Sequence, residues 1–173
     1  MLKPNSLRAH LTAATPELRQ DPDKLTISAG SGRIVCTGAG GLSFEYRYTL
    51  HVTVLDYASH ADAIIVPLLA WLRDNQSEIF HNPELQAKSI RFDVDYLNKE
   101  TVDLGIEIDL TERVIVKASL PEPGEDDPGA GGAKRFDVKH VGEPEPLGII
   151  KQREHWTFHI RDQLLAEWDY DPR

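Results

Sequence analysis

The chain has 173 residues and 40% of them are hydrophobic, which is enough for the core of one domain with or without an appendage. Its 28 acidic and 19 basic residues give a net charge of −9, a sign that disfavours nucleic acids and anionic membranes as partners. The single cysteine, Cys36, excludes an internal disulfide; we expect a buried, inert thiol in a protein made in a reducing cytosol.

The first elements predicted along the chain are a short helix and a strand pair. The first residues lack the apolar stretch of a signal peptide, and Leu residues at helical spacing predict an amphipathic helix over residues 4–15. Residues 25–36 contain two short strand-like runs. The Gly30-Ser31-Gly32 segment between these runs is typical of a hairpin turn.

The strongest periodicity covers residues 42–55, where every second side chain from Phe44 to Val54 is apolar. A strict period of two over this length is typical of a half-buried strand. Residues 61–76 then carry the broad apolar face of a helix. Pro67 lies within this helix, and proline removes a helical hydrogen bond. The helix therefore either kinks at Pro67 or becomes regular just before it.

Two further alternating segments, residues 89–96 and 102–116, predict a second strand pair. Both apolar sets must face the core, because a register slip of one residue would turn one set to water. A three-residue loop would set Asp95 opposite Asp103, and a five-residue loop would separate them. Because opposed like charges are unfavourable, we prefer the longer loop.

The polar face of this strand pair carries an acidic cluster, formed by Asp93, Asp95, Asp103, Glu107 and Asp109. Paired carboxylates can hold a divalent cation or perform acid–base chemistry. We interpret this cluster as a solvated sheet face, in which Arg91 and Arg113 reduce the repulsion between the carboxylates. A charged contact between subunits is the main alternative, and a cation site is less favoured.

The composition changes after residue 118. Residues 119–135 are rich in Pro, Gly and acidic side chains, which predicts a flexible linker. Residues 136–173 predict a short strand and an aromatic hairpin that turns at Arg161-Asp162. A lone hairpin is marginal in water, so we expect it to pack on something. The predicted organisation is a core domain over residues 1–118, the linker and a C-terminal appendage.

No pattern in the sequence predicts catalysis, a cofactor or a metal site. His155 and His159 are the most obvious metal pair, but on a strand they would lie about 13 Å apart, too far for one ion. No Ser or Cys lies in a glycine-flanked nucleophile elbow, and the glycines contain no phosphate-loop pattern. No apolar run approaches the roughly 20 residues that span a bilayer. We therefore expect neither an enzyme nor a membrane protein.

Four sequence blocks fall in order along the first part of the chain: residues 1–8 (MLKPNSLR), 42–50 (LSFEYRYTL), 64–76 (IIVPLLAWLRDNQ) and 110–113 (LTER). Together they resemble the tail completion protein R family of temperate contractile-tailed bacteriophages. The C-terminus resembles the family more weakly, through an aromatic-x-Ile pattern, a turn and a Leu-x-x-x-Trp pattern. In this chain the aromatic-x-Ile pattern is residues 158–160 and the Leu-x-x-x-Trp pattern is residues 164–168.

The predicted elements indicate an α+β protein in which the helices over residues 4–15 and 61–76 cover an antiparallel sheet. The resemblance implies that this fold is similar to that of tail terminators. It implies a structural virion protein, made in the bacterial cytoplasm, that completes the head-proximal end of the tail as a ring of about six copies. The implied partners are further copies, the tail tube or sheath, and head–tail connector or neck proteins. Another neck or tail-tube subunit of a phage or of a tail-like bacteriocin is the alternative, and a small-molecule-binding module is less favoured. Candidate interface residues are Pro67, Trp71, Glu112, Arg113, Trp156, Phe158 and Trp168.

Overall fold

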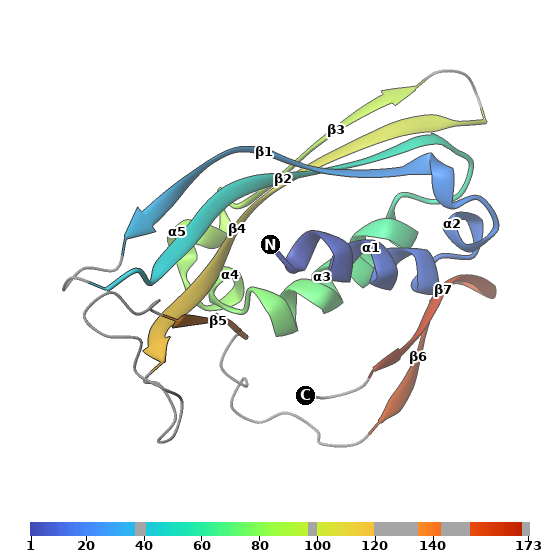
Figure 1. The fold of residues 1–173 in the computed structure, drawn as a ribbon. Coiled ribbons are helices and arrows are strands. Elements are labelled where there is room, and N and C mark those ends of the chain that lie inside the picture. The colour runs from blue at the N-terminus through green and yellow to red at the C-terminus, as the bar shows by residue number, and fades with distance from the viewer. Residues whose placement is uncertain (37–40, 97–99, 120–134, 143–152, 171–173) are drawn as a thin grey trace, which may run out of the picture.

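A computed structural model describes residues 1–36, 41–96, 100–119, 135–142 and 153–170. A curled antiparallel sheet forms one layer, the helices α1 (Lys3–Ala14) and α3 (Asp62–Asn75) lie against one face of it, and a two-stranded hairpin lies beyond the helices (Figure 1). The predicted α+β class is therefore confirmed. Within these residues, we find no helix with the length and apolar character needed to cross a membrane.

The main sheet has the strand order β1-β2-β4-β3, and β5 pairs with the far half of β4; β6 and β7 form the separate hairpin. The strands are β1 (Leu25–Cys36), β2 (Phe44–Tyr57), β3 (Ile90–Tyr96), β4 (Val102–Ser119), β5 (Arg135–Val141), β6 (Glu154–Ile160) and β7 (Gln163–Tyr170). The shorter helices are α2 (Pro16–Gln20), α4 (Glu78–His81) and α5 (Pro83–Gln86), and a 3₁₀ turn covers Pro22–Lys24. The side chain of Asn82 caps α5 by accepting a hydrogen bond from the N–H of Glu84. An asparagine at this position is a sequence signal for the start of a helix, but we did not predict α5 from it.

The core lies between the sheet and the helices α1 and α3. Alternate residues of β2 and β4 are buried there, while the residues between them form the outer, polar face of the sheet. The buried set comprises Tyr48, Leu50, Val52, Val54, Leu104, Ile106, Ile108 and Leu110. The period of two in the sequence thus correctly gives the face that each side chain occupies.

Residues 25–36 form one continuous strand, so the predicted hairpin turn at Gly30-Ser31-Gly32 is wrong. The segment is instead a bulge, where the pairing of β1 with β2 shifts register. A Cβ atom at Gly30 would lie 2.3 Å from the His51 ring, and one at Gly32 would lie 2.8 Å from the Cβ of Tyr48. The glycines are therefore required by the close approach of β2 and do not mark a chain reversal.

The register of β3 and β4 corresponds to the shorter loop, so the prediction of the longer loop is wrong. Asp95 lies directly opposite Asp103. Nη1 of Arg91 lies 2.9 Å from the carboxylate of Asp109, which is diagonal to it across the two strands. The longer loop would have placed Asp109 directly opposite Arg91. Asp103 accepts a hydrogen bond of 2.8 Å from the N–H of Asp56. The hydrogen bond from Asp56 offsets part of the cost of the opposed aspartates, which Arg91 does not contact.

Pro67 lies inside α3, which begins at Asp62, so the helix does not start at the proline. Proline leaves the carbonyl of residue i−4 without its helical donor. Here the hydroxyl of Thr15 donates to the carbonyl of Ala63 at 3.2 Å. The carbonyl of Pro67 is 3.1 Å from Nε2 of His10 and accepts its proton. Residues of α1 and the turn after it thus satisfy the backbone around the proline.

Both edges of the main sheet leave apolar side chains uncovered. Cys36, at the end of β1, is exposed, so the prediction of a buried thiol is wrong. On β3, Phe92 is 70% exposed and Tyr96 is 81% exposed, although alternation placed both toward the core. They do point to the helix side of the sheet, but β3 projects beyond the helices (Figure 1).

The C-terminal hairpin packs against the far side of the helix layer, in accord with the expectation that it needs a surface. Trp168 packs with Ala14 of α1 and with Val66 and Ala70 of α3. The guanidinium carbon of Arg73 lies 5.0 Å from the centre of the Trp156 ring, a cation–π contact that joins α3 to β6. The helices are thus enclosed between the sheet and the hairpin.

The hairpin turn contains a strained residue, which gives a prediction. Arg161 has φ 53°, a left-handed conformation that costs a non-glycine residue about 1–2 kcal/mol. Glycine removes this strain but gains freedom in the unfolded chain, so we expect Arg161→Gly to stabilise the protein by about 0.5–1 kcal/mol. Thermal unfolding should show a rise of about 1–4 °C. Arg161→Ala is the control, and an equal rise in Tm for both variants would contradict the role of φ.

His10 makes the stability depend on pH. Burial lowers its pKa below the ordinary value of 6.5, against the smaller opposing effects of the Pro67 carbonyl and Asp74. The unfolded chain therefore binds more protons than the folded chain between the lowered pKa and pH 6.5. We expect the free energy of unfolding to keep its highest value above this pH range and to decrease as the pH falls through it.

Denaturant unfolding across this pH range measures the effect. His10→Gln keeps a donor for the carbonyl of Pro67 but does not titrate, so its stability should change less with pH. An identical pH dependence of the two proteins would exclude His10 as the cause.

Candidate interaction surfaces

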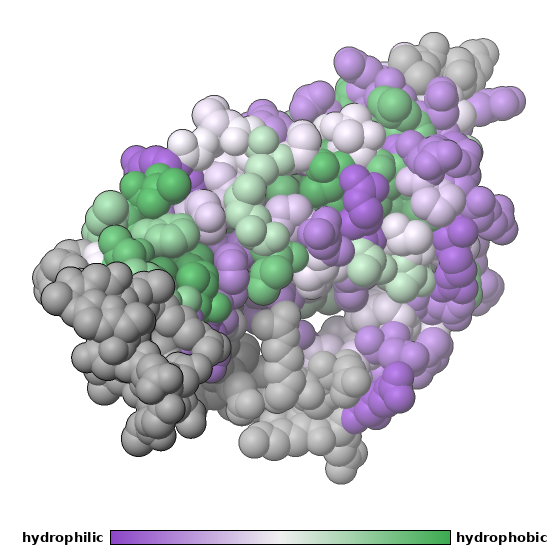
Figure 2. Space-filling model, viewed as in Figure 1, coloured by the Kyte–Doolittle hydropathy of each residue, from purple (hydrophilic) through white to green (hydrophobic). Residues whose placement is uncertain are grey.

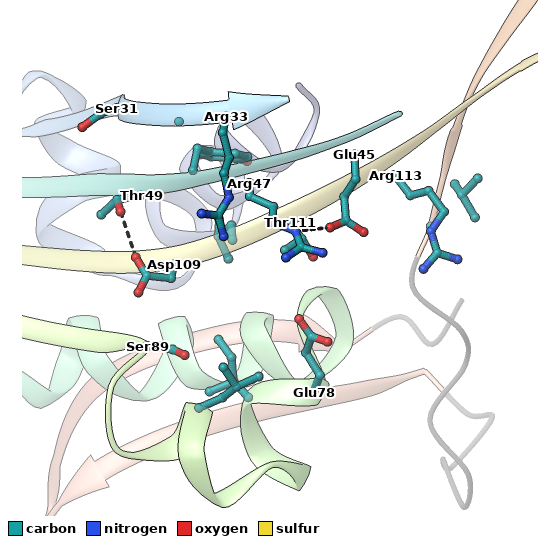
Figure 3. A pocket seen from close by; sticks show the side chains of 17 residues that line it. Ser31, Arg33, Glu45, Arg47, Thr49, Glu78, Ser89, Asp109, Thr111 and Arg113 are labelled. Carbon is teal, nitrogen blue, oxygen red and sulfur yellow. Dashed lines mark hydrogen bonds and ion pairs between the residues drawn. The ribbon is translucent and has the colours of Figure 1, made fainter. Parts of the chain in front are cut away.

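A groove of about 860 Å³ runs along the outer face of the sheet, where β1, β2 and β4 face α4 and α5. We call it the arginine groove, because Arg33, Arg47 and Arg113 line it from three neighbouring strands. Figure 3 shows these side chains on the side of the sheet that faces Glu78 and Ser89. Alternation along each strand places all three arginines on the outer face.

The groove holds guanidinium groups that the described chain does not neutralise. Arg47 pairs with Glu45, which lies two residues away on β2. Arg33 and Arg113 form no ion pair with any other described residue. Glu78 on the opposite wall accepts a hydrogen bond from the neutral amide of Gln76. Glu45, Glu78 and Asp109 also line the groove, so it is Arg33 and Arg113 that are available to a partner carrying carboxylates.

Asp109, at the other side of the groove, already has hydrogen-bond partners within the chain. Asp109 accepts hydrogen bonds from Arg91 and, at 2.8 Å, from the hydroxyl of Thr49. The Arg91 guanidinium and, less strongly, Thr49 hold the pKa of the Asp109 carboxyl below its ordinary value despite partial burial. The prediction that Arg91 relieves the acidic face is confirmed, whereas Arg113 lies opposite Glu45, away from the acidic cluster.

The second surface is the projecting end of β3 and β4, which we call the acidic tip. Asp93, Asp95 and Asp103 lie on its outer face, and none forms an ion pair with a described basic residue. The exposed rings of Phe92 and Tyr96 lie on its other face. Exposed aromatic side chains gathered on a projecting element mark it as a candidate surface for a protein–protein contact.

Glu112 holds the N-terminus of the chain against the sheet. Its side chain is buried and accepts hydrogen bonds of 2.6 Å from the N–H of Leu2 and 2.6 Å from the hydroxyl of Tyr48. The N–H of Lys3 lies 3.4 Å from the same carboxylate. These N–H groups begin α1 and have no partner within the helix. Burial and the hydrogen bond to Glu112 raise the pKa of Tyr48, so its hydroxyl stays protonated.

The seven predicted interface residues occupy different settings. Pro67, Trp71, Glu112 and Trp168 are buried, Trp156 and Phe158 are half-buried, and Arg113 is exposed. Trp71 donates from Nε1 to the hydroxyl of Ser6 at 3.1 Å, which satisfies its polar atom inside the chain. The buried residues offer little area to a second subunit. Arg113 stays a direct interface candidate, and Arg33 and Arg47 were missed because only the strand register brings the three together.

His155 and His159, which we expect not to share a metal ion, lie on β6, which is a strand as predicted. Nδ1 of His155 lies 3.0 Å from the carboxylate of Asp169 on the neighbouring strand. Among the residues whose structure is described, no group of three His, Cys, Asp or Glu side chains is arranged to hold a metal ion.

Comparison with known proteins decides the family. A family model described as P2 phage tail completion protein R (GpR) matches residues 1–144. The chain is also 39% identical over 169 residues to tail completion protein R of Escherichia phage P2, covering 98% of this chain and 99% of that protein. The chain belongs to the tail completion protein R family. The resemblance of the four sequence blocks is thereby confirmed.

The match of this R-family chain to the phage P2 protein extends beyond the core to nearly the whole length, so it includes the region of the C-terminal hairpin. No solved protein structure gives a significant match to the chain. The predicted assignment to a phage tail completion protein is therefore confirmed by sequence.

Proposed function

We propose that this R-family protein completes the head-proximal end of a phage tail as a closed ring, after which the tail stops growing and joins the filled head. The observation that carries this proposal is the 39% identity to the phage P2 protein over nearly the full length of both chains. The ring would consist of about six copies to match the tail tube, and its fold would be that of a tail terminator. The role is structural and not catalytic.

The exposed surfaces support an assembly role. Among the described strands, β1 and β3 form open edges of the main sheet, and open edges are templates for strand addition by another chain. Apolar residues near the opposite end of the sheet are also exposed, namely Ile34, Leu42, Phe136 and Val138. Figure 2 shows hydrophobic side chains gathered at that end, over β1, β2 and β4. The C-terminal hairpin packs on the helices of its own chain, so the sheet is the better candidate for subunit contacts.

Interruption of the gene in the phage that encodes the chain tests the proposal. We expect filled heads and separate tails of uneven length, seen by electron microscopy, and a large loss of plaques. Supplying the intact chain in trans should restore joining. Normal joined particles in its absence would contradict a role in tail completion, and assembly of the purified chain into open tubes would instead identify a tail-tube subunit.

A further inference from the structure

Two like-charge pairs of opposite sign lie on the outer face of the sheet, near its opposite ends. Asp95 lies opposite Asp103 between β3 and β4, whereas Arg33 lies opposite Arg47 between β1 and β2. Directly opposed like charges destabilise a sheet. The aspartate pair has no basic partner among the described residues. In the arginine pair Glu45 neutralises Arg47, so Arg33 is the guanidinium that remains available to a surface of the other sign.

The apolar side chains beside these pairs are arranged in the same way at both ends. Phe92 and Tyr96 lie on the helix side of the sheet, behind the aspartates of the acidic tip. Ile34 and Val138 lie on the helix side near the arginine groove, and Ile34 is 63% exposed. At both ends of the sheet, charged side chains therefore lie on the outer face and apolar side chains lie on the helix side.

We propose that the acidic tip of one copy docks at the arginine groove of a second copy, a contact that rests on the ring proposed above. The groove volume of about 860 Å³ leaves room for side chains of a hairpin end. Arg33 and Arg113 would pair with Asp93 and Asp95, which form no ion pair with the described residues of their own chain.

Each copy carries both a tip and a groove, so the contact can repeat from copy to copy. When each copy gives its tip to one neighbour and its groove to the other, the contacts make a ring if the rotation closes. Two copies related by a twofold axis would instead exchange tip and groove reciprocally. The proposed ring requires the first arrangement, and the size of the assembly distinguishes it from the dimer.

Two charge-reversed variants test the contact. The first is Asp93→Lys with Asp95→Lys, which makes the tip basic and removes the repulsion between Asp95 and Asp103. The second is Arg33→Glu with Arg113→Glu, which makes the groove acidic. All four side chains are exposed, so the folded monomer should be retained, as far-UV circular dichroism and thermal unfolding would verify.

Association is measured by analytical ultracentrifugation over a concentration series. We expect each variant alone to need on the order of 100-fold more protein to associate than the wild type, because like charges would then face each other. An equimolar mixture should associate again, since a basic tip fits an acidic groove and the native tip fits the native groove. A control with the same charge change as the first variant, Asp162→Lys with Asp169→Lys on the hairpin, should associate as the wild type does.

The outcomes separate the contact from the ring. A wild type that associates while both variants associate equally well would overturn the contact but leave the ring. Variants that fail alone and also fail as a mixture would likewise overturn the pairing of tip and groove. A wild type that stays monomeric up to its solubility limit, and also when purified tails are added, would overturn the ring and the contact with it.

Discussion

Replacement of Trp168 by alanine is expected to lower the free energy of unfolding by about 3–5 kcal/mol, the usual cost of truncating a buried tryptophan. Trp168 is 7% exposed and packs between β7 and the helices. Its ring centre lies 6.0 Å from that of His10 and 5.8 Å from that of Trp156. The cavity would open between the hairpin and the helix layer. Denaturant unfolding measures the loss, and hydrogen exchange should show earlier opening of β6 and β7 than of the main sheet.

Leu164→Ala is the matched control for this prediction. Leu164 lies on the same strand but is 40% exposed, so its truncation should cost less than about 1 kcal/mol. Similar losses for the two variants would contradict the view that Trp168 anchors the hairpin to the helices.

Replacement of Glu112 by alanine is expected to cost about 2–4 kcal/mol, because hydrogen bonds to a charged group are strong and the buried hydroxyl of Tyr48 loses its acceptor. The hydroxyl of Tyr48 and the N–H of Leu2 would both be left without this carboxylate. We expect the loss in denaturant unfolding to be accompanied by faster hydrogen exchange in the first turn of α1.

A double-mutant cycle with Tyr48→Phe isolates the contact between the two side chains. Because both changes remove the same hydrogen bond, the combined loss should be smaller than the sum of the single losses. Glu107→Ala is the control, since Glu107 is 43% exposed and pairs with Arg91 at the surface. Strict additivity of Glu112 and Tyr48, or a loss no larger than that of the control, would contradict the proposed anchoring of the N-terminus.

The regular elements could be predicted because their signals are local. The alternation from Phe44 to Val54 gives the strand and its buried face, and the predicted helix over residues 61–76 matches α3 apart from its end residues. Features set by neighbouring strands could not be predicted. Gly30 and Gly32 look like a turn, yet the side chains of β2 require them at a bulge.

The candidate interaction surfaces also depend on how distant parts of the chain come together. Trp71 appears suited to an interface in the sequence because it lies near the polar end of its helix, but Ser6 of α1 satisfies its indole N–H inside the chain. Arg33, Arg47 and Arg113 look unrelated along the chain, and only the register of three strands gathers them in one groove. The linker predicted over residues 119–135 lies almost entirely outside the described residues, so it stays a prediction, as does the division into a core and an appendage.

The native mass of the purified protein over a concentration series, with and without isolated tail tubes, tests the central claim most directly. The account predicts a closed assembly of one size, near six copies, that forms in solution or on the end of a tube. A protein that stays monomeric under both conditions, or that grows into filaments without a fixed size, would contradict a ring that completes the tail.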